Sequence, residues 1–322
     1  MRKSEHQYRT FKNKGLWLLF LLLGLHLNSV AQQDAQYTQY MYNTVSVNPG
    51  YTGSRGQLSI AALYRAQWVG LEGAPKTQTF NFHTPLGYNG VGIGMSIIND
   101  QIGPTSETML DLDFSYTVQT SDEARLSFGL KASAHLLDIR FSELNQDYSQ
   151  PGGPDPTLQE DIQNKFSPNI GAGIYYHTEH FYAGLSVPRI LETSHFDSSS
   201  LSTAREEINY YFITGYVFDM TPLWKFKPTL LTKVVAGAPL QIDLSANFMY
   251  NEKLIMGAAY RWDAALSAMA GFQISSEFLI GIAYDREITE LGQAVFNDGS
   301  FEVILRYDFI KALDNLKSPR FF

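Results

Sequence analysis

Residues 301–309, with the sequence FEVILRYDF, alternate between large apolar side chains and mostly polar ones. Successive side chains of a β-strand point to opposite faces of the sheet. One face therefore carries only apolar side chains: Phe301, Val303, Leu305, Tyr307 and Phe309. The other face carries Glu302, Ile304, Arg306 and Asp308. A strand of about ten residues with this pattern is typical of a β-barrel whose outer surface meets lipid and whose interior is polar.

The same alternation recurs along most of the chain. It places Leu112 and Phe248 toward lipid, and Asp113 and Asn247 toward the lumen. The stretches expected to form strands are 58–68, 77–84, 90–98, 107–118, 124–136, 167–177, 181–187, 208–218, 225–235, 240–250, 254–262, 266–275, 278–286 and 300–310. The sequence therefore predicts an all-β fold: a transmembrane, antiparallel, up-and-down β-barrel of about 14 strands at residues 58–310.

The links between these strands alternate in length. Short polar turns, such as residues 251–253, alternate with longer links at 69–76, 99–106, 137–166, 188–207 and 287–299. Bacterial outer-membrane barrels have short periplasmic turns and longer outer loops. The pattern predicts that both chain ends lie in the periplasm and that the long loops are extracellular. A soluble all-β fold is the alternative, but it gives no reason for the loop lengths to alternate.

A cleaved secretory signal peptide is expected at residues 1–31. Basic residues precede an apolar run from Leu16 to Leu27, and small residues follow at Ser29 and Ala31. A retained membrane anchor is the alternative, although the run is shorter than the ~20 residues that a spanning helix needs. Residues 32–57 are expected to form an N-terminal periplasmic segment, and residues 311–322 a C-terminal periplasmic tail.

The composition excludes several classes of function. The chain has no cysteine, which excludes disulfides and zinc–cysteine sites. A formal net charge of −8 is not the basic footprint of a nucleic-acid-binding protein, so no nucleic-acid partner is expected.

The residues that resemble catalytic or binding motifs have simpler interpretations. His177 and His180 fall at a tight turn, which favours a solvated turn over a metal site. Gly90, Gly92 and Gly94 alternate with apolar residues and fit small lumen-facing positions better than a phosphate loop.

Asp111 and Asp113 share the lumen face of one strand, and the basic residues with the register to join them are Arg65, Lys131, Lys233, Arg261 and Arg306. A lumen lined by opposite charges explains them better than a catalytic carboxylate pair. We expect no enzyme, no cofactor and no metal.

Residues 36–53 form the other informative stretch. It opens with QYTQYMYN at residues 36–43 and continues with NPGYTG at residues 48–53. The proline and the glycines predict turns, and the aromatic side chains need burial. A position tucked into the mouth of the barrel would bury them.

This stretch and the segment RAQWVGLEGAPKT at residues 65–77 resemble the PorP/SprF family of type IX secretion system membrane proteins of the Bacteroidetes. The residues that carry the resemblance are Gln36, Gln39, Tyr40, Asn43, Asn48, Pro49, Arg65, Gln67, Trp68, Gly73 and Pro75. Shorter matches, such as Lys227-Pro228 and Tyr284-Asp285, extend it over nearly the whole mature chain. The sequence departs from the family pattern at Gly50 and Thr52, where alanine is expected.

The resemblance implies a non-enzymatic accessory protein of type IX secretion in the cell outer membrane. SprF-like members are associated with export or surface attachment of adhesins that carry a type B C-terminal sorting domain, and hence with gliding motility. PorP-like members are general components of the machinery. The implied partners are outer-membrane lipid, a secreted adhesin or other type IX substrate, and other components of the system. Two alternatives stay open: an outer-membrane transport pore for small solutes, and a lipid-modifying enzyme, for which the sequence shows no nucleophile–base pair.

Overall fold

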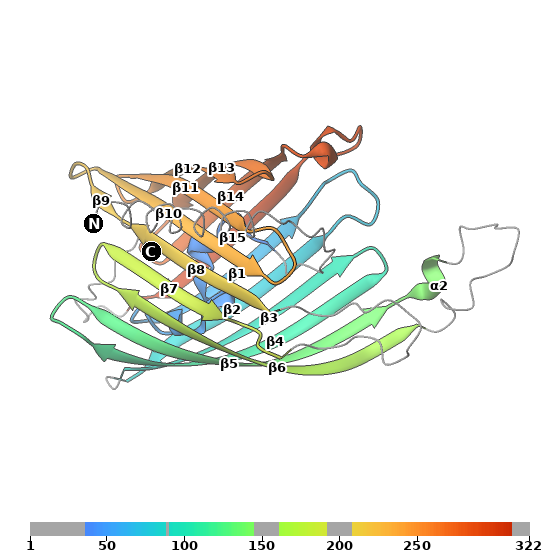
Figure 1. The fold of residues 1–322 in the computed structure, drawn as a ribbon. Helices are drawn as coiled ribbons and strands as arrows, with labels where there is room; N and C mark the ends of the chain where they lie inside the picture. Colours follow the sequence, from blue (N-terminus) through green and yellow to red (C-terminus); the bar gives the residue numbers. More distant parts are fainter. Residues whose placement is uncertain (1–35, 88–89, 145–160, 192–207, 311–322) are drawn as a thin grey trace, which may run out of the picture.

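The computed structural model describes residues 36–87, 90–144, 161–191 and 208–310. All strands of this part of the chain belong to one antiparallel sheet. The last strand, β15, pairs with β1, and β10 pairs with β11, so the sheet closes into a barrel (Figure 1). β8 and β9 both pair with β10 and together fill one position, which gives a barrel of 14 strands. The predicted fold class is confirmed.

The strands follow the periodicity of the sequence. Each expected strand is present, and the largest differences are at the end of β3 and the start of β6. The bounds are β1 (Leu58–Ala66), β2 (Lys76–Leu86), β3 (Val91–Ile102), β4 (Thr105–Gln119), β5 (Arg125–Ile139), β6 (Ile162–His177), β7 (Phe181–Val187), β8 (Asn209–Tyr216), β9 (Phe218–Asp219), β10 (Trp224–Val235), β11 (Gln241–Tyr250), β12 (Leu254–Arg261), β13 (Ala265–Gln273), β14 (Phe278–Glu287) and β15 (Ser300–Phe309).

The two faces of the sheet separate apolar from polar side chains as the alternation predicts. Leu112 is 54% exposed on the outer wall, whereas Asp113, the next residue of β4, is 4% exposed and points into the lumen. In β15 the apolar face is outside, and Glu302, Arg306 and Asp308 are buried inside. Such an outer face suits hydrocarbon, where every backbone hydrogen bond has to be made within the barrel. Among the described residues, no helix has the length and hydropathy to cross a membrane.

The prediction of a long loop at 99–106 is wrong. β3 continues to Ile102 and β4 begins at Thr105, so only Gly103 and Pro104 turn the chain. The outward side chains in this region are polar, and Asn99 Nδ2 donates to Thr108 Oγ1 at 3.0 Å. The apolar alternation therefore stops at the edge of the hydrophobic band, while the backbone pairing continues beyond it. For the same reason the 137–166 link narrows to residues 140–161, and the short helix α2 (Phe141–Leu144) follows β5.

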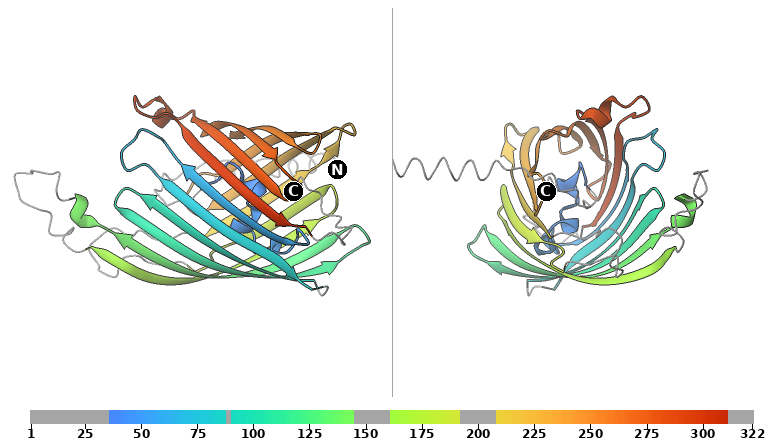
Figure 2. Two further views of the ribbon diagram at one scale, coloured as in Figure 1. Left: turned by 180° about the vertical axis from the view of Figure 1, so that it is seen from behind. Right: turned by 45° about the vertical axis from the view of Figure 1, so that its right-hand side comes forward.

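Residues 36–57, which we name the lumen segment, lie inside the barrel (Figures 1 and 2). The segment contains three 3₁₀ turns, η1 (Tyr40–Tyr42), η2 (Thr44–Ser46) and η3 (Pro49–Tyr51), and its apolar side chains form the core together with inward residues of the strands. The expected periplasmic segment at 32–57 is thus, over its described part, a filling of the lumen. Burial of its tyrosines gives the physical reason. The expected signal peptide at 1–31 and tail at 311–322 lie outside the described residues.

Candidate functional site

The lumen segment contacts the barrel wall on all sides. Its backbone and side chains hydrogen-bond to strands β2, β4, β6, β7, β10, β11, β14 and β15. Tyr37 Oη lies 2.8 Å from Thr79 Oγ1 on β2, and Tyr40 Oη lies 2.8 Å from Thr229 Oγ1 on β10. A segment held from opposite walls crosses the lumen and obstructs it.

Inward-facing glycines make room for this segment. A Cβ atom on Gly129 would collide with the backbone of Pro49 and Gly50, and one on Gly173 would collide with the Asn48 side chain. The glycines whose added Cβ would meet the segment are Gly92, Gly94, Gly129, Gly173, Gly184 and Gly281. Gly92 and Gly94, which imitate a phosphate loop in the sequence, therefore lie on the lumen wall against Thr52. The missing Cβ atoms of these glycines therefore leave the space in the barrel wall that the lumen segment occupies.

The start of the segment is bound by a buried ionic cluster. Arg65 Nη2 lies 2.7 Å from Asp285 Oδ2, and Arg65 Nη1 lies 3.2 Å from Glu302 Oε2. The backbone N–H groups of Thr38 and Gln39 donate to the two Glu302 oxygens at 2.9 and 2.8 Å. One guanidinium thus faces two carboxylates, and backbone donors of the segment add stabilisation to Glu302. Loss of one partner from such a buried network is costly because a charge stays uncompensated.

The end of the segment is bound by a second ionic contact. Arg55 Nη2 and Nε lie 2.7 and 3.1 Å from the two oxygens of Asp308, in a bidentate arrangement. Arg306 Nε lies 3.4 Å from the same carboxylate. Bidentate Arg–carboxylate pairs fix geometry as well as adding energy. The segment is therefore clamped near both of its ends.

Aromatic residues fill the space between the two clamps. Lys227 Nζ lies 4.5 Å from the centre of the Tyr42 ring, in a cation–π arrangement. Tyr51 packs edge-on against Tyr175, with 5.3 Å between ring centres. Burial raises the pKa of the Tyr37, Tyr40 and Tyr42 phenols above their usual value. The middle of the lumen is a packed core, not a water-filled channel.

The motif at residues 65–75 is divided between the lumen and the rim of the barrel. Arg65 lies in the ionic cluster, whereas Gln67 to Pro75 form the β1–β2 loop. Trp68 Nε1 donates to Glu287 Oε1 at 3.1 Å, and the Gly73 carbonyl accepts from Gly103 N at 2.9 Å. Trp68 and Gly73 adopt positive φ, at 47° and 71°. Gly permits that conformation readily, while Trp adopts it rarely. The loop is thus braced against its neighbours at the rim.

The family-motif residues of the N-terminal stretch all lie in the lumen segment. Gln36 Nε2 donates to Gln241 Oε1 at 2.8 Å, and Asn43 Oδ1 accepts from Asn81 Nδ2 at 2.7 Å. The Asn48 side chain caps η3 by accepting from Gly50 N, and Pro49 occupies its first position. Sequence reasoning did not find Asp285, Glu302 and Asp308 as partners of this segment.

The structure places the remaining candidate residues of the sequence in different parts of the barrel. The Lys131 ammonium lies 2.8 Å from Asp111 and 3.2 Å from Asp113, as expected for a lumen lined by opposite charges. Lys233, Arg261 and Arg306 also face the lumen and are buried. His177 is buried in the lumen wall, whereas the exposed His180 ring pairs with Asp219 at 2.9 Å. The described part of the chain contains no group of residues placed to hold a metal ion.

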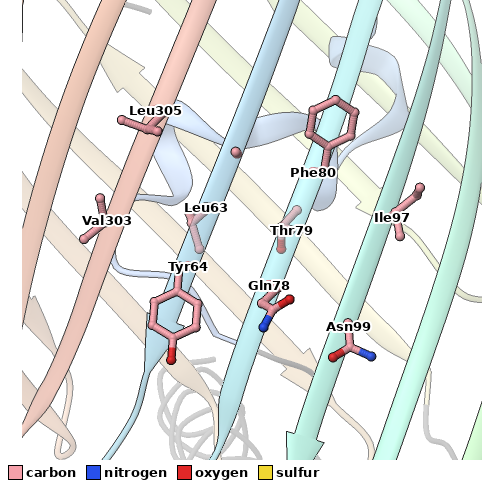
Figure 3. Close-up of a pocket in the computed structure, with 10 residues that line it drawn as sticks. Leu63, Tyr64, Gln78, Thr79, Phe80, Ile97, Asn99, Val303 and Leu305 are labelled. Atoms are coloured by element: carbon pink, nitrogen blue, oxygen red, sulfur yellow. The ribbon is translucent and has the colours of Figure 1, made fainter.

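A shallow groove of about 420 Å³ lies on the outer wall over β15, β1, β2 and β3 (Figure 3). Tyr64, Phe80, Val303 and Leu305 surround the small side chain of Ala62, which leaves the depression. This wall belongs to the apolar outer face, so the groove lies on the surface that faces lipid.

Closed architecture, an apolar outer wall and a filled lumen define a membrane-spanning β-barrel protein with an internal plug. The sequence model of a family described as type IX secretion system membrane protein PorP/SprF matches residues 29–307. The chain belongs to this family, and the resemblance inferred from its motifs is confirmed. Family and fold together make it an outer-membrane component of type IX secretion.

No curated protein matches the chain. Solved structures that resemble it include the Ralstonia pickettii toluene transporter TbuX, at 10% identity and a TM-score of 0.48, covering 82% of this chain and 92% of that one. The CymD monoaromatic hydrocarbon channel has 11% identity and a TM-score of 0.47, covering 88% and 93%. The outer membrane protein Omp33 of Acinetobacter baumannii has 9% identity and a TM-score of 0.42, covering 79% and 100%. Likenesses of this size carry no conclusion about function.

The fit between glycines and lumen segment gives a testable expectation. Gly129→Ala places a Cβ against the backbone of Pro49 and Gly50, and overpacking of about 1–3 kcal/mol should raise the displaced fraction of the segment about tenfold. Arg55 is 6% exposed, so trypsin cleavage after Arg55 should accelerate in proportion, as followed by N-terminal sequencing of fragments. Gly271→Ala, whose Cβ would meet neighbours at 3.3 Å or more, is the control. Equal cleavage of both variants would contradict the fit.

Proposed function

We propose that this chain is a non-enzymatic accessory component that assists the secretion or surface attachment of partner proteins, such as adhesins with a type B C-terminal sorting domain. The observation that carries the proposal is the family match over residues 29–307. The partners proposed are the secreted protein, other type IX components and outer-membrane lipid.

The filled lumen supports this function over a transport pore for small solutes. Clamps at Arg65 and Arg55 hold the lumen segment at both ends, and tyrosines occupy the space between them. A secreted protein has no open path through such a barrel. Partner contact is therefore assigned to the loops, since strand residues are committed to lipid, lumen or backbone pairing.

The orientation proposed is periplasmic chain ends with long loops outside the cell. On one side the strands are joined by short turns at 120–124, 178–180, 251–253 and 274–277; on the other side lie the links 67–75, 140–161, 188–208 and 288–299. Short links at 103–104, 236–240 and 262–264 also lie on this second side. The support for the orientation therefore comes from the four long links, none of which has a counterpart on the short-turn side. The loop centres at 145–160 and 192–207, expected to be the main partner-contact regions, lie outside the described residues.

Gene deletion tests the proposed function. The deletion strain should lose one or a few proteins from its surface, measured by mass spectrometry of surface-biotinylated cells, while uptake of small solutes stays normal. Complementation with the intact gene should restore the surface proteins. An unchanged surface proteome, or an uptake defect in its place, would favour the pore.

A further inference from the structure

A cavity of about 770 Å³ opens at the short-turn end of the barrel, beyond the Arg55 clamp. Residues 52–58 form one wall, and the ends of β2 to β6 form the other. It lies outside the packed middle of the lumen and has the volume of a small-ligand pocket.

Two basic side chains from neighbouring strands line this cavity. Arg125 on β5 and His177 on β6 are direct partners in the antiparallel register, so both side chains lie on the lumen side. Arg125 is exposed at the mouth and has no ion pair or side-chain hydrogen bond within the described residues.

Buried polar atoms at the same place lack partners. His177 is 6% exposed, and neither of its ring nitrogens has a hydrogen-bond partner in the described part of the chain. The fully buried Thr52 Oγ1 shares this property. Buried polar groups are normally hydrogen-bonded, and leaving one unsatisfied costs free energy. Both residues line the cavity, so an imidazole and a hydroxyl without hydrogen-bond partners lie at its wall.

The residues that line the cavity indicate the charge and the shape of a ligand that could supply an acceptor. No acidic residue of the described chain lines the cavity, while Pro85, which shares the inward register of His83 on β2, supplies apolar surface. The nearest clamp carboxylate, Asp308, is already bound by Arg55. A guanidinium with neighbouring neutral donors suits a carboxylate, which accepts charge-assisted hydrogen bonds, and the apolar wall suits a hydrocarbon stem.

We propose that this cavity is a binding site for a carboxylate carried on an apolar stem, entering from the short-turn end of the barrel. Arg125 pairs with the carboxylate, His177 donates a hydrogen bond to it, and the apolar wall packs against the stem. A free organic acid and the C-terminal end of a polypeptide both present this chemistry.

Isothermal titration of the intact protein in detergent micelles tests the site. The probe is 4-phenylbutyrate, compared with its neutral amide and with inorganic phosphate. The acid should bind about tenfold more tightly than the amide, because only the acid forms an ion pair with the Arg125 guanidinium. Phosphate should bind weakly, since it lacks the stem. Two phenylalanine-ended hexapeptides, one a free acid and one a C-terminal amide, distinguish a polypeptide source from a free acid.

Matched variants assign the binding to the cavity. Arg125→Gln should weaken phenylbutyrate binding about tenfold, and His177→Leu should weaken it to a lesser extent. Lys253→Gln removes the same charge from an exposed turn at the same end of the barrel and should leave binding unchanged. Acid and amide binding equally, no heat from any probe, or equal losses in the Arg125 and Lys253 variants would each overturn the proposal.

Discussion

Deletion of residues 36–55 is expected to convert the obstructed barrel into a conducting pore. These residues cross the lumen and are held by strands on opposite walls. The inward glycines that accommodate them, Gly129 and Gly173 among them, would then border open space. Barrels of this size enclose a lumen too wide for wall side chains alone to fill, so ion conductance in planar bilayers should rise about tenfold or more over the intact protein.

The deletion variant has to be shown to retain its barrel. Heat-modifiable migration on gels, compared with that of the intact protein, reports the closed sheet. A variant that stays folded and does not conduct would contradict the assignment of the segment as the plug. Glu302→Gln, which weakens the hold on the Thr38 and Gln39 backbone without removing the segment, should give rare, brief openings. The size of the effect should thus follow the number of contacts removed.

The strands could be predicted from the sequence because their signal is local. Alternation with period two marks residues 301–309 as clearly in the sequence as in β15. The apolar alternation stops predicting a strand where the outward side chains no longer face hydrocarbon. At residues 99–106 the outward side chains leave the apolar band, so the pairing of β3 with β4 continues without an apolar pattern.

The position of the lumen segment could not be predicted in the same way. Its partners Asp285, Glu302 and Asp308 lie more than two hundred residues away along the chain, and their meeting depends on the stagger of a closed sheet. One signal was nevertheless present. Gly129 and Gly173 are inward-facing and directly paired across β5 and β6, and small residues on adjacent inward positions indicate a close approach by other backbone.

Replacement of Arg65 is expected to give the largest loss of stability of any single charge substitution in the clamps. Arg65→Gln leaves Asp285 and Glu302 facing each other in a site where both are at most 1% exposed. Removing one partner from a buried ionic network typically costs about 3–5 kcal/mol. The loss should appear as a lower urea midpoint for unfolding from lipid vesicles, followed by tryptophan fluorescence. Arg140→Gln is the control, since the Arg140–Glu143 pair is half exposed and should change stability by less than about 1 kcal/mol.

A compensating variant separates the charge imbalance from lost packing. In the triple variant Arg65→Gln, Asp285→Asn and Glu302→Gln, no charge is buried without a partner. The amide oxygen of residue 302 can still accept from one of the two backbone N–H groups, of Thr38 or of Gln39, that Glu302 binds. Because the penalty of the single variant comes mainly from its uncompensated carboxylates, the triple variant should recover most of the lost stability. It should open at least as often as Glu302→Gln and stay closed for most of the time, since the tyrosines and the Arg55 clamp remain. A triple variant as unstable as Arg65→Gln alone would show that the guanidinium stabilises the barrel through packing, and the ionic account of this clamp would then be wrong.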